Sequence, residues 1–76
     1  MNKERRKNLQ GIIDQLEELA GAVEDIQEEE EEYRDHIPEN MQSGERYEQA
    51  EAACGALAEA ADSISSAIDS INEAIG

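Results

Sequence analysis

The sequence predicts an all-α protein, a single antiparallel helical hairpin that occupies residues 1–76. Three observations support this prediction. Two ladders of mostly apolar residues step by alternating three and four positions, which is the pattern of a coiled-coil helix. One break that contains the only proline separates them. The ladders have the same length, so each position of one finds a partner in the other when they are laid antiparallel.

The first ladder predicts a helix over about residues 3–36. It comprises Leu9, Ile12, Leu16, Leu19, Val23, Ile26, Glu30, Tyr33 and Ile37. The acidic run at 28–32 has the composition of a solvated face or a disordered tract. Because the ladder resumes in phase after this run, we expect the helix to continue through it. Pro38 ends this helix, since the residue before a proline is driven out of the helical region.

The second ladder predicts a helix over about residues 43–75. It comprises Tyr47, Ala50, Cys54, Leu57, Ala61, Ile64, Ile68, Ile71 and Ile75. The loop of about 37–42 is short enough to join antiparallel neighbours. We expect a turn to open at Pro38, and Ser43 to cap the second helix with Asn40 as the alternative cap.

Laying the ladders antiparallel sets Ile37 opposite Tyr47 and Glu30 opposite Cys54. We expect the stem of Glu30 to pack while its carboxylate reaches water. Cys54 stands among alanines, and we expect it to act as a small buried hydrophobe.

Further apolar residues flank the ladders and predict self-association. They are Ile13, Ala20, Ala53, Ala60, Ala67 and Ala74. With the ladders they make faces too wide for one partner helix. We therefore expect two or more hairpins to form a homodimer or higher oligomer, as a four-helix or larger bundle. The alternative interpretation is that the alanines are simply good helix formers.

The charge balance narrows the choice of partner and compartment. Six Lys and Arg against 20 Asp and Glu give a net charge of −14. Such a field disfavours direct nucleic-acid binding and favours a protein partner with a basic surface, although it also serves solubility. No apolar run approaches the roughly 20 residues of a membrane span, so we expect no membrane partner. The single cysteine fits a reducing cytoplasm.

The sequence predicts no enzyme, no metal site and no cofactor. It contains no glycine-rich phosphate loop, nucleophile elbow or zinc spacing. A metal site would have to recruit Glu30, Cys54 and His36. Di-iron bundles use paired Glu-x-x-His motifs, whereas Tyr33 stands three residues before the only histidine.

The candidate partner-binding residues gather around the break between the ladders. They are Tyr33, Arg34, His36, Ile37, Pro38, Met41, Arg46 and Tyr47. Tyrosine, arginine and methionine are enriched at protein interfaces, and the first two at their energetic hot spots. The competing interpretation is a packed loop in which Arg34 and Arg46 neutralise nearby acids.

Three stretches carry a resemblance over nearly the whole chain: NKERRKNLQGIIDQLEEL, EEEEEYRDHIPENMQSGERYEQAE and IDSINEAIG. The chain resembles short acidic helical-hairpin proteins of phages and mobile elements of Gram-positive bacteria. The central segment, residues 33–51, is the most specific part. The resemblance implies a phage or mobile-element origin and the cytoplasm of a bacterial host. Because small phage proteins often inhibit host defences, it also favours an antagonist of a host factor, by association alone.

Several functions are compatible with these features. The tip residues can bind a host or phage protein, or the acidic faces can mimic nucleic acid in a basic groove. Alternatively, Arg34, Arg46, His36 and the tyrosines of several subunits can surround an anionic nucleotide, which would make the protein a small-ligand sponge. A structural role in a particle is the remaining alternative.

Overall fold

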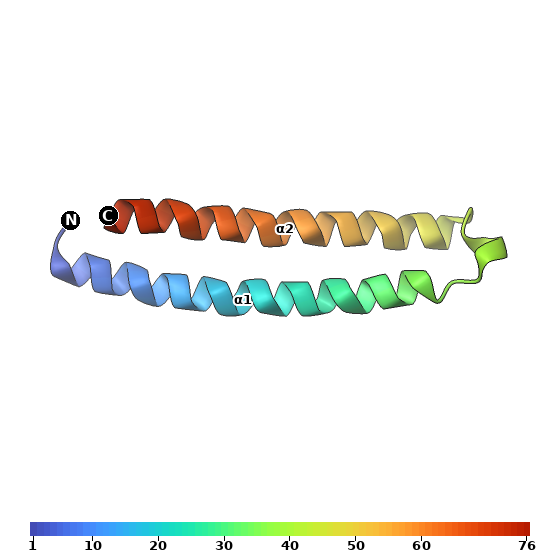
Figure 1. Ribbon diagram of the computed structural model, residues 1–76, viewed down its shortest axis with the longest axis horizontal. Coiled ribbons are helices and arrows are strands. Elements are labelled where there is room, and N and C mark those ends of the chain that lie inside the picture. The colour runs from blue at the N-terminus through green and yellow to red at the C-terminus, as the bar shows by residue number, and fades with distance from the viewer.

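The computed structural model describes all 76 residues as two long antiparallel helices (Figure 1). Helix α1 spans Lys3–Asp35 and helix α2 spans Glu45–Ile75, and the short 3-10 helix η1, Glu39–Met41, lies between them. The molecule measures 59 by 15 by 12 Å, with both termini at the end opposite η1. The predicted all-α hairpin is confirmed.

The ends of the helices follow from local hydrogen bonding. The side chain of Asn2 accepts a hydrogen bond from the backbone N of Arg5 at 2.8 Å, which satisfies one of the free amides of the first turn. Pro38 opens η1, as predicted, and its carbonyl accepts a bond from the backbone N of Met41 at 2.8 Å. The N-cap of α2 is Gly44 and not Ser43 or Asn40. Ser43 lies inside the turn that the Gly44 amide closes by donating to the carbonyl of Met41, so it precedes the cap position.

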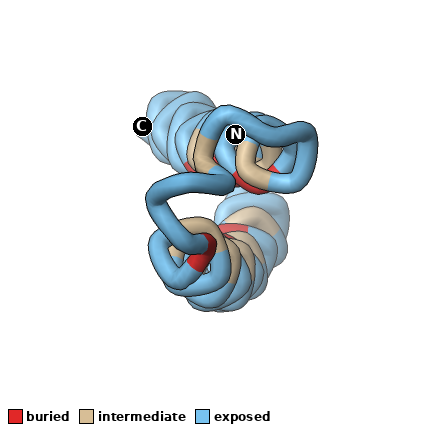
Figure 2. Tube along the Cα trace, turned by 90° about the vertical axis from the view of Figure 1, so that its right-hand side faces the viewer, coloured by how far each residue is buried: buried red, intermediate tan, exposed pale blue.

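The ladder of α2 faces α1 along its whole length, as predicted. Ala50, Cys54 and Ala61 are buried, and the other six members are half-buried. In Figure 2, which looks along the hairpin from its tip, buried segments of both helices appear where the helices face each other.

The prediction for α1 was wrong at every second member of its ladder, which lies one position before the residue that faces α2. Leu9, Leu16, Val23, Glu30 and Ile37 are buried or half-buried, but the positions between them are not the ones that were predicted. The intervening inward positions are Ile13, Ala20, Gln27 and Arg34. Ile12, Leu19, Ile26 and Tyr33 are instead between 41% and 56% exposed.

We call the line of residues along which each helix faces the other its seam. The physical reason for the difference is that residues three and four positions after a seam residue lie on opposite sides of it on the helix surface. Both sides of α1 carry apolar residues, so the pattern does not decide which side meets α2. This also corrects the expected role of Ile13 and Ala20. They are 2% and 9% exposed inside the hairpin, so they are not free to bind a second copy while it is closed.

The core of the hairpin is thin. Only six residues are buried, and four of these are alanine or cysteine. Towards the tip, α1 contributes the half-buried polar residues Gln27, Glu30, Glu31 and Arg34 to the contact. A chain of this size therefore has little buried apolar area to stabilise the closed hairpin.

Candidate functional site at the hairpin tip

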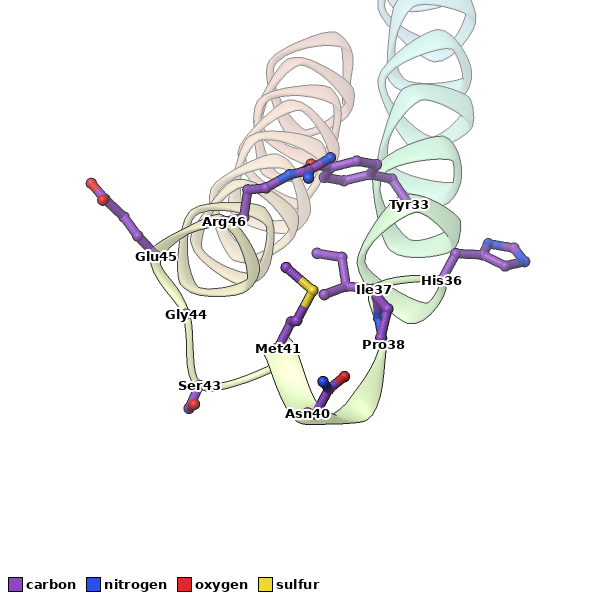
Figure 3. A pocket seen from close by; sticks show the side chains of 10 residues that line it. All are labelled: Tyr33, His36, Ile37, Pro38, Asn40, Met41, Ser43, Gly44, Glu45 and Arg46. Carbon is purple, nitrogen blue, oxygen red and sulfur yellow. Dashed lines mark hydrogen bonds between the residues drawn. The ribbon is translucent and has the colours of Figure 1, made fainter.

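A cavity of about 470 Å³ opens at the tip, and it is the only cavity of the molecule. The last turn of α1, η1 and the first turn of α2 surround it (Figure 3). Its lining residues are Tyr33, His36, Ile37, Pro38, Asn40, Met41, Ser43, Gly44, Glu45 and Arg46. Six of the eight predicted partner-binding residues are among them.

The floor of the cavity is apolar. Ile37 is 8% exposed and belongs to the hairpin core, whereas Met41 on η1 is 50% exposed. Figure 3 shows the Met41 and Ile37 side chains directed towards one another in the middle of the site. A half-exposed methionine is a flexible apolar surface that adapts to the shape of a bound side chain.

One rim of the cavity is a polar bridge between the two long helices. Arg46 Nε donates a hydrogen bond to the Tyr33 hydroxyl at 2.8 Å. The guanidinium carbon lies 5.6 Å from the centre of the Tyr33 ring. Because this bridge uses only Nε, the two terminal nitrogens of Arg46 can still donate to acceptors on a partner.

The remaining polar side chains point outward from this centre. Figure 3 shows His36, Ser43 and Glu45 directed away from Met41 and Ile37. His36 Nδ1 donates to the carbonyl of Glu32 at 2.7 Å, which holds the ring on the outside of α1. These residues therefore form the outer surface around the cavity rather than its floor.

Arg34 and Tyr47, also predicted to bind a partner, do not line the cavity. Arg34 is half-buried on the side of α1 that faces α2, and its Nε lies 3.1 Å from Asp35 Oδ1. The hydrogen bond to Asp35 raises the pKa of the Arg34 guanidinium. Tyr47 is half-buried in the first turn of α2, where the ladder of this helix begins. In this structure both residues contribute to the contact between the helices.

Four cavity residues were missed by the sequence reasoning: Asn40, Ser43, Gly44 and Glu45. Small polar residues of this kind are ordinary components of turns and carry no chemical signal of binding. The only available signal was their position between predicted tip residues.

Cys54 and its neighbours show no reactive arrangement. Burial raises the pKa of the Cys54 thiol. Among the charged groups of α1, Arg34 lowers this pKa, whereas Glu31 and Glu30 raise it. Glu30 was predicted to lie opposite Cys54, and its carboxylate is one of the charges that act on this thiol. No group of three or more His, Cys, Asp or Glu side chains in the molecule could hold a metal ion.

Comparisons of the chain with protein families, with curated proteins and with solved structures gave no match. Neither α1 nor α2 has a stretch that is long and apolar enough to cross a bilayer.

Proposed function

We propose that this hairpin is a non-enzymatic interaction protein of phage or mobile-element type that binds a host protein through its tip cavity and antagonises it. The observation that carries the proposal is the cavity itself. It combines the apolar surface of Ile37 and Met41 with the Tyr33–Arg46 bridge at its rim. An apolar anchor surrounded by tyrosine and arginine is the usual composition of a protein-binding hot spot.

The charge around the cavity defines the chemistry of the partner. Glu39 in η1 and Glu45 beside the rim stand at the tip of a chain with a net charge of −14. A partner that inserts an apolar side chain between basic residues would match both the floor and its surroundings. Electrostatic attraction would then accelerate the encounter, while the inserted side chain would slow dissociation.

Two features favour a protein partner over an anionic nucleotide. Arg46 is the only lysine or arginine that lines the cavity, and Glu45 lies beside it. Arg34, the second cation expected to bind a nucleotide, is paired with Asp35 outside the cavity. At the cavity of each hairpin, the phosphates of a nucleotide would therefore meet a single arginine and a carboxylate.

The test is site-specific photo-crosslinking in bacterial lysate. A photoreactive amino acid replaces Asn40 at the cavity, or Ser66 on the exposed side of α2 as a matched control. We expect one host protein to be crosslinked from position 40 and not from 66. Unlabelled chain should compete for this crosslink, whereas a Tyr33→Ala/Arg46→Ala chain should not.

Two results would contradict the tip as the binding site. Crosslinking of the same protein from both positions, with steep loss at high salt, would indicate acidic mimicry along the helices. A thermal shift with nucleotides that disappears in an Arg46→Ala chain would indicate the sponge instead.

A further inference from the structure

Helix α1 exposes a regular apolar stripe that the hairpin does not use. Ile12, Leu19, Ile26 and Tyr33 recur every seventh residue and are between 41% and 56% exposed. Helix α2 carries a matching stripe of Arg46, Ala53, Ala60, Ala67 and Ala74, also at every seventh residue. Within it, Ala53 is half-buried and the four others are exposed.

The two stripes lie on the same side of the hairpin. Tyr33 is the last member of the α1 stripe and Arg46 is the first member of the α2 stripe. The hydrogen bond of 2.8 Å between their side chains joins the stripes at the tip. Because members of one heptad position follow one line along a helix, the stripes run side by side from the tip towards the termini. We call this surface the open face.

Charged residues are almost absent from the open face, although they make up 34% of the chain. On a helix, the surface neighbours of a residue lie three and four positions away. For Ala53, Ala60, Ala67 and Ala74 all such neighbours are uncharged: Gln49, Ala50, Ala56, Leu57, Ser63, Ile64, Ser70 and Ile71. For the α1 stripe only Glu29 and Glu30 are charged. The acids of α2 therefore avoid this surface.

We propose that a second copy of this chain covers the open face and forms a twofold-symmetric four-helix bundle. The stripes are self-complementary, since one is built of large residues and the other, beyond Arg46, of alanines. In the antiparallel register of the seams, Ile12, Leu19, Ile26 and Tyr33 come within about one helical turn of the levels of Ala74, Ala67, Ala60 and Ala53.

Rotating a copy by half a turn about the long axis sets its α1 on α2 of the first chain. Each large side chain then lies within about one helical turn of an alanine of the other chain, and the symmetry repeats every contact. Alternation of large and small residues across an interface is the arrangement that fills space without voids.

The size of the open face suits a dimer. The hairpin is 59 Å long and 15 Å wide, so one side offers roughly 900 Å², against about 800 Å² for each partner in a stable protein interface. Such an interface would also supply the apolar burial that the thin core of one hairpin lacks. This inference does not depend on the proposed function, because the stripes beyond Tyr33 and Arg46 lie outside the tip cavity.

Complementary charge substitutions test both the dimer and its pairing. One variant carries Ala60→Glu and Ala67→Glu, and the other carries Leu19→Lys and Ile26→Lys. Each alone should weaken self-association by at least about 100-fold, because a charge would be buried without a partner. An equimolar mixture should form a 1:1 dimer, since the glutamates of one chain then face the lysines of the other. The mass is measured by sedimentation from micromolar to millimolar concentration, and helix content by circular dichroism.

The control variant, Ala52→Glu/Ser66→Glu, adds the same two charges to exposed positions of α2 outside the open face. It should keep the mass of the wild-type dimer, twice 8.4 kDa. A wild-type chain that stays at 8.4 kDa at millimolar concentration would overturn the proposal. So would a mixture that fails to pair although the wild type is dimeric, because α1 would then not lie on α2 of the other copy.

Discussion

Arg46 is the residue where the two surfaces of the hairpin meet. Its guanidinium closes the rim of the tip cavity, and its position begins the stripe that continues as alanines along α2. The other arginine of this region, Arg34, has a different environment because Asp35 already neutralises it. Two arginines with the same chemistry therefore have different prospects of meeting a partner.

This pair gives the first prediction. Arg46→Ala should weaken binding of the crosslinked host protein by about 30-fold, as expected for an interface arginine. Arg34→Ala should leave the affinity within about threefold of wild type, because its side chain is engaged within the hairpin. Calorimetric titration of the partner compares the two variants. An equal loss for both arginines would show that the attraction is general and not local to the cavity.

The second prediction concerns Cys54. Burial raises the pKa of its thiol, so the folded chain retains this proton at a pH where the unfolded chain has lost it. Unfolding therefore becomes easier as the pH rises above about 8.5, the usual value for cysteine. Urea titrations at increasing pH should show this loss of stability in the wild type. A Cys54→Ala chain should lack this contribution, and an identical pH profile for both chains would contradict the prediction.

At the scale of the helices, the main question is which side of α1 meets α2. Neighbouring isoleucines provide a matched pair, because Ile13 is 2% exposed and Ile12 is 44% exposed. Ile13→Ala should lower the free energy of unfolding by about 2–5 kcal/mol, as for other buried isoleucines. Ile12→Ala should act only through assembly, so its effect on the melting temperature should fade on dilution.

Circular dichroism melts at several chain concentrations separate these effects. Equal losses that do not depend on concentration would show that both isoleucines contribute to the hairpin core in the same way. The seam would then not have the one-sided packing described above.

Two glycines inside the helices offer a fourth prediction. A Cβ atom added at Gly21 or at Gly55 would meet nothing within 4 Å. Replacing a helical glycine by alanine stabilises a helix by about 1 kcal/mol when no contact is disturbed. Gly21→Ala and Gly55→Ala should therefore each raise the unfolding free energy by about this amount, measured in urea. Loss of stability in either variant would indicate that a neighbour approaches the glycine in the assembled protein.

The sequence was sufficient to predict both helices, the break at Pro38 and the seam of α2. A proline and a heptad pattern have direct steric consequences, and α2 has its bulkiest apolar residues on one face. The seam of α1 could not be predicted in the same way, because Ile12 and Ile13 occupy both possible sides. Only the approach of the partner helix decides between them.

Only part of the tip could be predicted from the sequence. Met41 and Arg46 belong to residue types that are enriched at interfaces, so composition alone indicated them. Whether an arginine lines a cavity or packs between helices depends on the direction of its side chain. That direction follows from which side of α1 faces α2, and this side places Arg34 between the helices and not at the cavity.

At the scale of the whole molecule, charge opposes assembly while the open face favours it. Each chain carries a net charge of −14, so two copies repel one another. Added salt screens this repulsion without weakening apolar contacts, and self-association should therefore tighten as salt increases. Sedimentation at low and high sodium chloride measures the dissociation constant of the dimer. Weaker association at high salt would indicate that ion pairs hold the copies together.

The uneven placement of charge also affects how two copies meet. A hairpin whose acids are sparse along one long side has a weak electric field on that side and a more negative potential elsewhere. Two such molecules repel least when their weakly charged sides face each other, so the field itself would guide them towards the productive orientation before contact. Unproductive encounters along the acidic sides would be discouraged in the same way, which would protect a chain with exposed leucine and isoleucine from random aggregation.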